Sequence, residues 1–238
     1  MKCCLSVLLA VLCLSSAHAE IAVIGSDGAV PGIASSDVPV GSYIRSDAPG
    51  DSKPNNFLLV GELNSNRGSL RGVLSFDLGA IPSGATINSV TLSLFQDKAT
   101  AGRGGFLPVD IELFSISGAI TPGATWNNSA SQFDSLLASL PGNTRTVVLN
   151  QEFAFSSTAL TQYVQDSVPG GTLDLGLKVP ALEALTNLPT GEYFIFDGPD
   201  AIGYSSSTDS IGPSLRVDYD IAGGNGTSPD GGVVINEI

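Results

Sequence analysis

The sequence predicts an all-β protein built as one antiparallel β-sandwich. Apolar and polar residues alternate with a period of two along several segments, as they do in strands with one buried and one solvated face. Gly, Pro, Asn and Asp residues separate these segments and supply the turns between them. Roughly ten strands in about 200 residues fit a single sandwich better than two domains.

The clearest alternation lies in Leu70–Leu78, where the leucines and Phe76 fall on one face. Arg71, Ser75 and Asp77 fall on the opposite face, so we expect that face to be wet. Further strands are expected at Tyr43–Arg45, Phe57–Gly61, Val90–Leu94, Val109–Ile116, Thr144–Leu149, Leu173–Val179, Glu192–Asp197 and Leu215–Ile221.

The segment Leu70–Phe95 consists of two alternating runs joined by the turn-rich stretch Gly79–Thr86. We predict that the two runs form an internal antiparallel pair and that their connection lies outside the core. The side chains of this pair that should point into the core are Leu74, Phe76, Leu92 and Leu94.

Helical spacing of apolar residues occurs in two places and predicts two short helices, each closing an end of the sandwich. The second follows the sequence FSST, whose serines and threonine can cap a helix N-terminus. The residues with this spacing are Phe133, Leu136, Leu137 and Leu140 in the first helix and Leu160, Val164 and Val168 in the second.

Residues 1–19 have the features of a secretory signal peptide. Lys2 gives a positive start, Leu5–Leu14 is an apolar run too short to span a membrane, and Ala17–Ala19 supplies small residues before a cleavage site. The alternative is a buried first strand or helix. We expect a secreted, extracellular chain that begins at Glu20 and does not insert into a membrane.

Loss of this peptide would remove every cysteine and the only histidine. A disulfide, a thiol nucleophile, a Cys/His zinc site and a Ser-His-Asp triad are then excluded from the mature chain. Paired carboxylates, lysine and tyrosine remain as groups for catalysis.

The mature chain is strongly acidic. The whole chain has 10 Lys+Arg and 23 Asp+Glu, and loss of Lys2 leaves 9 against 23, a net charge of −14. Binding to nucleic acid requires clustered Lys and Arg, so nucleic acid is not an expected partner.

Several motifs together resemble the DNRLRE-domain family, which is close to the family-96 carbohydrate-binding modules. The family pattern has a strand ending in Arg, a Leu-Val-Gly strand and a Phe-Asp-Leu … Ile-Pro-x-Gly-Ala core. The matching segments are Tyr43–Arg45, Leu59–Gly61, Phe76–Leu78, Ile81–Ala85, Thr125–Asn128, Ser157–Asp166 and Gly212–Asp220, so that the resemblance covers residues 21–221.

This resemblance implies a jelly-roll-like sandwich over residues 20–222 that binds a polysaccharide or cell-surface glycan without cleaving it. Family members that bind acidic polysaccharide should present a basic groove. The mature chain has only three lysines and six arginines, which does not favour an alginate-like ligand.

The C-terminal residues differ from the rest of the chain. Residues 223–232, GGNGTSPDGG, have the composition of a flexible linker. Val233–Ile238, VVINEI, resembles the opening strand of a lamin-tail domain and therefore implies the start of a truncated second domain.

Trp126 is the first candidate for a sugar contact, because it is the only tryptophan and sugar rings stack on indole faces. The alternative, which the family pattern favours, is a structural Trp126 that anchors a loop. Tyr43, Tyr193 and Tyr204 are further stacking candidates, and Arg45, which ends the first family strand, is a candidate polar contact.

Two acidic turns are candidate calcium sites. Asp47 and Asp51 lie close together in SDAPGD, and Asp197 and Asp200 do so in DGPD. Ca²⁺ prefers carboxylate and carbonyl oxygens of this kind, whereas solvated turn aspartates are the alternative. Structural Ca²⁺ is therefore the one candidate cofactor.

Three functions remain open at this point. The first is a carbohydrate-binding module of a larger secreted protein. The second is a structural or adhesive β-sandwich of a surface protein without specific sugar binding. The third is a lyase or hydrolase that uses carboxylates or tyrosine, for which we assign no catalytic residue.

Overall fold

The computed structural model describes residues 18–25, 40–50, 57–62, 68–96, 108–120, 124–143, 151–185, 192–197 and 212–221. Several predictions fall outside these ranges: the strand Thr144–Leu149, the candidate residues Asp51, Asp200 and Tyr204, the linker 223–232 and the segment Val233–Ile238.

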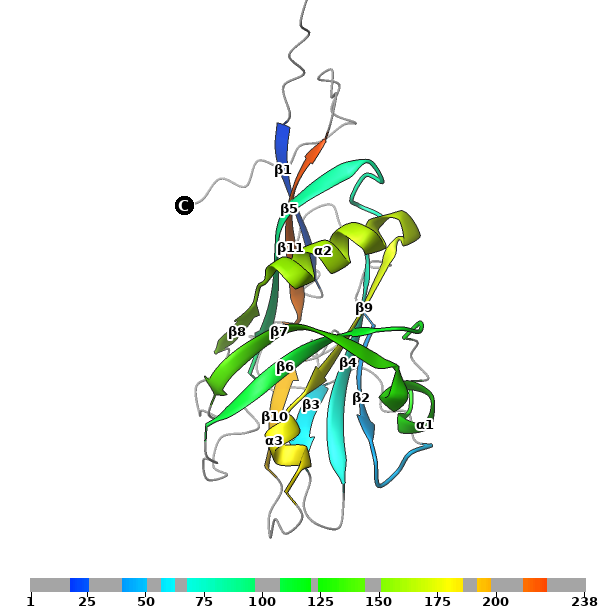
Figure 1. The fold of residues 1–238 in the computed structure, drawn as a ribbon, viewed down its shortest axis with the longest axis vertical. Helices are drawn as coiled ribbons and strands as arrows, with labels where there is room; N and C mark the ends of the chain where they lie inside the picture. The colour runs from blue at the N-terminus through cyan, green and yellow to red at the C-terminus, as the bar shows by residue number, and fades with distance from the viewer. Residues whose placement is uncertain are drawn as a thin grey trace, which may run out of the picture.

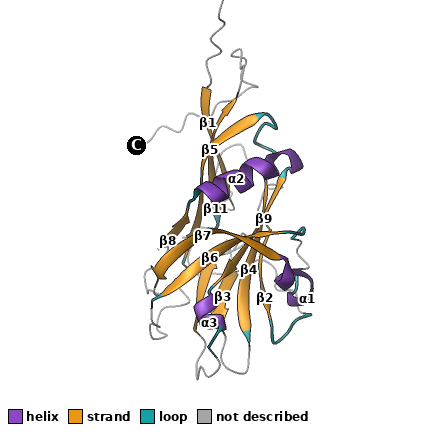
Figure 2. Cartoon of the chain, in the orientation of Figure 1, coloured by secondary structure: helices purple, strands orange, loops and turns teal. Residues whose placement is uncertain are grey.

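Two antiparallel sheets form a β-sandwich, which confirms the predicted all-β fold (Figure 1). Strands dominate the described residues, and the helices are short (Figure 2). The four-stranded sheet has the order β1 (His18–Gly25), β11 (Ser214–Ile221), β5 (Ala85–Phe95), β8 (Glu152–Phe155). The seven-stranded sheet has the order β10 (Glu192–Asp197), β3 (Phe57–Glu62), β4 (Ser69–Asp77), β9 (Thr172–Lys178), β6 (Val109–Ile116), β7 (Phe133–Asn143), with β2 (Val40–Arg45) paired to β4.

The main hydrophobic core fills the space between the two sheets. As predicted, Leu74 and Phe76 of β4 and Leu92 and Leu94 of β5 are fully buried in it. Burying each of these side chains stabilises the fold by roughly 1.5–3 kcal/mol. The alternation in the sequence therefore identifies the inward faces of β4 and β5 correctly.

The predicted pairing of β4 with β5 is wrong, because the two strands lie in different sheets. β4 pairs with β2, β3 and β9, whereas β5 pairs with β11 and β8. The connection crosses from one sheet to the other, and it does not lie wholly outside the core as predicted, because Ile81 is buried there. Alternation shows which face of a strand is buried, but it does not identify the neighbouring strand.

The predicted helix around Phe133–Leu140 is also wrong, because this segment forms β7. Its pairing with β6 shifts register at several points, which makes the spacing of buried residues irregular. Leu137 and Ala138 are buried, whereas Leu136 is 51% exposed. Bulges thus produced an apolar spacing that imitates a helical face.

The predicted second helix is confirmed as α2 (Thr158–Ser167). The Ser157 side chain caps it by accepting a hydrogen bond from the Leu160 N–H at 2.9 Å. Leu160 and Val164 face the core, and the turn η4 (Val168–Gly170) continues the helix with Val168 buried.

α2 joins the two sheets at one end of the sandwich, as predicted (Figure 1). The Gln165 amide accepts from the Ile87 N–H at 2.8 Å and donates to the Ala85 carbonyl at 3.1 Å, covering backbone groups of β5. The Tyr163 hydroxyl lies 3.2 Å from the Ile116 carbonyl oxygen in the other sheet. Among the described residues no helix has the length and apolar character needed to cross a membrane.

Candidate ligand-binding face

Most of the outer face of β4 is covered rather than wet, contrary to the sequence prediction, and only Asp77 at its end is exposed. Val73 is fully buried and Ser75 is nearly so, although both point away from the main core. Val73 packs with the segment that contains α1 (Trp126–Ser129) and the turn η3 (Ala130–Gln132). A second apolar cluster forms there from Ile44, Val73, Ile116, Ile120 and Ala124, with Trp126, Ala130 and Phe133 packed against it.

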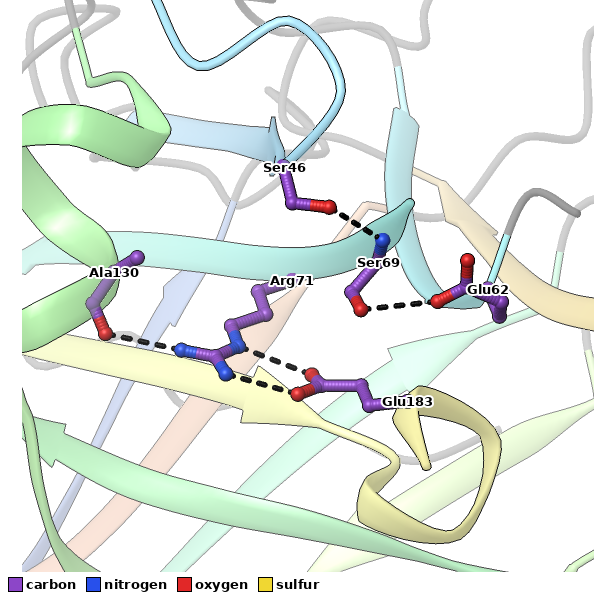
Figure 3. A network of polar contacts seen from close by, with 6 residues as sticks. All are labelled: Ser46, Glu62, Ser69, Arg71, Ala130 and Glu183. Carbon is purple, nitrogen blue, oxygen red and sulfur yellow. Dashed lines mark hydrogen bonds and ion pairs between the residues drawn. The ribbon is translucent and has the colours of Figure 1, made fainter. Parts of the chain in front are cut away.

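Arg71 of β4 lies beside this second cluster, and each of its three guanidinium nitrogens donates a hydrogen bond (Figure 3). Its Nε donates to Glu183 Oε1 at 3.0 Å, and its Nη2 donates to Glu183 Oε2 at 2.8 Å. Its Nη1 donates to the Ala130 carbonyl at 3.0 Å. Glu183 ends the short helix α3 (Pro180–Glu183), so Arg71 connects β4 with α3 and η3.

Three aromatic rings alternate with two cations across this surface. The Arg71 guanidinium carbon lies 4.6 Å from the Trp126 ring centroid and 5.2 Å from that of Phe133. The Lys178 ammonium lies 4.8 Å from the Phe133 centroid and 4.2 Å from that of Phe114. We call these five residues, Arg71, Phe114, Trp126, Phe133 and Lys178, the aromatic–cation face; all are half-buried.

Strand register places the members of this face next to one another. Gly72 of β4 is opposite Leu177 of β9, so Arg71 and Lys178 are neighbours on the outer side. Phe114 of β6 is opposite Gly176 of β9. A Cβ atom at Gly176 would lie 2.3 Å from the Phe133 ring, so only glycine leaves room for that ring here.

The position of Trp126 depends on local hydrogen bonds at the start of α1. The Asn128 side chain accepts from the Thr125 backbone N–H at 2.7 Å, which fixes the first turn. The Asn127 N–H donates to the Pro49 carbonyl at 3.0 Å, which ties α1 to the turn after β2. The TWNN sequence thus holds Trp126 over the outer face of the seven-stranded sheet.

The ammonium group of Lys178 is held over rings rather than by a carboxylate. Burial lowers the pKa of Lys178 and the positive charge of Arg71 lowers it further, while Glu183 and Glu112 act in the opposite direction. Within the part of the chain that the structure describes, no hydrogen bond or ion pair engages this ammonium. Its donors are available to a ligand there.

A second polar group lies beside Arg71, at the end of β3 (Figure 3). The Ser69 hydroxyl donates to Glu62 Oε2 at 2.9 Å, and the Ser69 N–H donates to the Ser46 hydroxyl oxygen at 2.8 Å. Burial raises the pKa of Glu62, which is 5% exposed. The hydrogen bond from Ser69 opposes this shift, and the charges of Glu183 and Asp47 add to it.

The structure brings Trp126 to this face but covers part of it. One side of the indole meets Arg71, and the ring also packs against the second cluster. This arrangement agrees with the structural alternative for Trp126, while its remaining exposed surface is still open to a ligand.

The other candidate sugar contacts are not brought together with Trp126. Arg45 binds Asp47 in a bidentate ion pair, with Nε–Oδ1 and Nη2–Oδ2 distances of 2.9 and 2.6 Å. Tyr193 is half-buried on the edge strand β10, separated from β4 by β3. Tyr43 lies in β2 opposite Gly72, but its side chain is outside the described part of the structure.

The calcium sites stay predictions. Asp197 is fully buried at the end of β10, and Asp47 is engaged by Arg45. In the described ranges, no group of three or more His, Cys, Asp or Glu side chains could hold a metal ion. Asp51 and Asp200, the second member of each predicted pair, are outside those ranges.

Sequence reasoning did not select Arg71, Phe114, Phe133 or Lys178 as site residues. One signal was available: Arg71 and Lys178 each stand at an outward position of a strand whose inward residues are apolar. Their partners Phe133 and Glu183 come from segments that alternation does not connect with them. No family model matches the chain, and no curated protein is significantly similar to it.

Proposed function

We propose that this protein is a secreted, non-catalytic carbohydrate-binding module and that the aromatic–cation face is its glycan-binding surface. The observation that carries the proposal is the alternation of three half-buried rings with two cations across one face of the seven-stranded sheet. Sugar C–H groups stack on aromatic faces, and charged side chains beside the rings hydrogen-bond sugar hydroxyls.

The β-sandwich is compatible with this role, although a fold alone does not define a function. The resemblance to DNRLRE domains supports binding without catalysis. The absence of Cys and His after residue 19 supports it as well, because thiol, imidazole and triad chemistry would be excluded from the processed chain.

Secretion belongs to the same proposal. Cleavage before Glu20 would remove His18 and Ala19, which form the first two pairs of β1 with β11. The intact mass of the exported protein tests this directly. A mass that retains Cys13 would contradict the predicted processing site.

A structural or adhesive sandwich is the second candidate, and one observation favours it. Three nitrogens of Arg71 are already bound, and the rings already contact cations of the same chain. The role of such a face could be limited to holding α1, η3 and α3 on the sheet.

Affinity electrophoresis on a panel of polysaccharides distinguishes the two candidates. Phe114→Ala removes a ring from the face, and Phe95→Ala removes a half-buried ring from the four-stranded sheet as a matched control. We expect at least one glycan to retard the wild-type protein. Phe114→Ala should lose this retardation, and Phe95→Ala should keep it. Absence of retardation, or equal behaviour of the two variants, would favour the structural candidate, and turnover of a polysaccharide would reject the non-catalytic role.

A further inference from the structure

We propose that the aromatic–cation face binds a neutral glycan rather than an acidic polysaccharide, an inference that rests on the proposed function. It concerns the class of ligand, and it follows from how the charges around the face are arranged.

Among the residues that the structure describes, the cations near the face provide little free positive charge. The Lys and Arg residues in the described ranges are Arg45, Arg71, Lys178 and Arg216. Ion pairs to carboxylates engage all of these except Lys178. Binding of a polyanion depends on several clustered, unneutralised cations, and the described part of the face offers a single ammonium of this kind.

Lys178 is itself surrounded by carboxylates. Glu112 of β6 is directly opposite it in the strand register, and Glu183 is close enough to favour its charged form. Asp110 is exposed on β6, two residues before Glu112. A chain of uronate or sulfate groups would approach these carboxylates as closely as it approaches Lys178, and like charges repel.

A neutral sugar suits the same groups. Its hydroxyls both donate and accept, so they can accept from the Lys178 ammonium and donate to the Glu112 carboxylate. Phe114 of β6 and Phe133 of β7, whose rings both contact the Lys178 ammonium, offer apolar surface for the sugar C–H groups. The face and the two carboxylates beside it, Glu112 and Glu183, therefore combine donor, acceptor and stacking surface, and the two carboxylate charges balance those of Arg71 and Lys178.

The test compares neutral and acidic polysaccharides on the full chain by calorimetry. The neutral probes are mixed-linkage β-glucan, xylan and galactomannan, and the acidic probes are alginate and polygalacturonate. We expect binding to at least one neutral probe, with Kd constant within about twofold between about 50 and about 500 mM NaCl. We expect no binding to the acidic probes.

The outcomes separate the inference from the proposed function. Binding to acidic probes alone, weakened by salt, would overturn the inference and leave the proposed function standing. Absence of binding to every probe would overturn both.

A charge-reversal pair sharpens the test. Glu112→Lys removes the carboxylate opposite Lys178, and Asp166→Lys makes the same charge change on the exposed side of α2. We expect Glu112→Lys to gain polygalacturonate binding at about 50 mM NaCl, at least about tenfold above Asp166→Lys. Equal gains in both variants would show that overall charge, rather than this face, excludes acidic ligands.

Discussion

The two sheets have similar alternation in sequence, but their outer faces differ. On the four-stranded sheet the outward residues Arg216 and Asp218 form an exposed pair, and the Ser89 hydroxyl donates to Asp218 at 2.6 Å. On the seven-stranded sheet the outward Val73 is fully buried, and Arg71 is enclosed between rings and a carboxylate. Polar outward residues therefore have different roles in the two sheets.

The cause of this difference is the segment that contains α1 and η3. It returns over the seven-stranded sheet and adds a second apolar cluster to the outer side of β4 and β2. Arg71, a half-buried charge at the border of that cluster, needs partners, because an unpaired charge away from water is costly. This need explains why Arg71 is bound by both Glu183 and the Ala130 carbonyl.

The largest expected effect concerns the main core. Phe76→Ala removes a ring that is 0% exposed between the sheets and should cost about 3–5 kcal/mol, through lost transfer energy and a cavity. Urea melts measure this free energy of unfolding. Phe95→Ala, at a half-buried position, is the control and should cost clearly less. Equal losses of unfolding free energy in the two variants would show that the residues around Phe76 move in to fill the cavity left by its ring.

The ion pairs provide a direct comparison of the two outer faces. Arg71→Met leaves Glu183 and the Ala130 carbonyl without their donor, and should cost about 1–3 kcal/mol. Arg216→Met removes an exposed pair and should cost less than about 0.5 kcal/mol. Side-chain exposures of 16% and 15% for the first pair, against 53% and 33% for the second, are the reason. Similar losses in both variants would contradict the difference between the faces.

Gly176 tests how tightly the aromatic–cation face is packed. Gly176→Ala places a methyl group 2.3 Å from the Phe133 ring and should cost about 1–2 kcal/mol as the ring moves. The fluorescence of Trp126, the only tryptophan, should change with it, because Phe133 and Trp126 share Arg71. Gly84→Ala is the control, since no atom lies within 4 Å of its added methyl group. An unchanged spectrum and stability in Gly176→Ala would show that the ring is loosely held.

The sequence contained much of the fold and little of the site, for a physical reason. Alternation reports burial along one strand, so it located β4, β9 and β11 and the inward residue Phe76 correctly. It carries no information about which strands pair, so β4 and β5 were joined wrongly. The site is formed by contacts such as Arg71–Glu183, whose residues are 112 positions apart, and no local pattern encodes such a contact.

The smallest expected effect is a pH dependence at the border of the second cluster. The pKa of Glu62 is raised by burial and by the charges of Glu183 and Asp47, so its ionisation destabilises the folded state. At pH values between the pKa of Glu62 in the unfolded state and its higher pKa in the folded state, the folded state binds more protons than the unfolded state. The free energy of unfolding therefore falls as pH rises through that window. Glu62→Gln keeps an acceptor for Ser69 but carries no charge. The stability of Glu62→Gln should therefore rise relative to that of the wild type as pH rises through that window, because only the wild type ionises the buried carboxyl.

Urea melts of both proteins at a series of pH values measure this difference. Asp174, whose pKa burial also raises, changes both proteins equally and cancels from the comparison. Ser69→Ala is the matched control: it removes the hydrogen bond that lowers the pKa of Glu62, so the fall in stability should move to higher pH. A difference between Glu62→Gln and the wild type that stays constant across this pH range would mean that Glu62 is better solvated than its burial indicates.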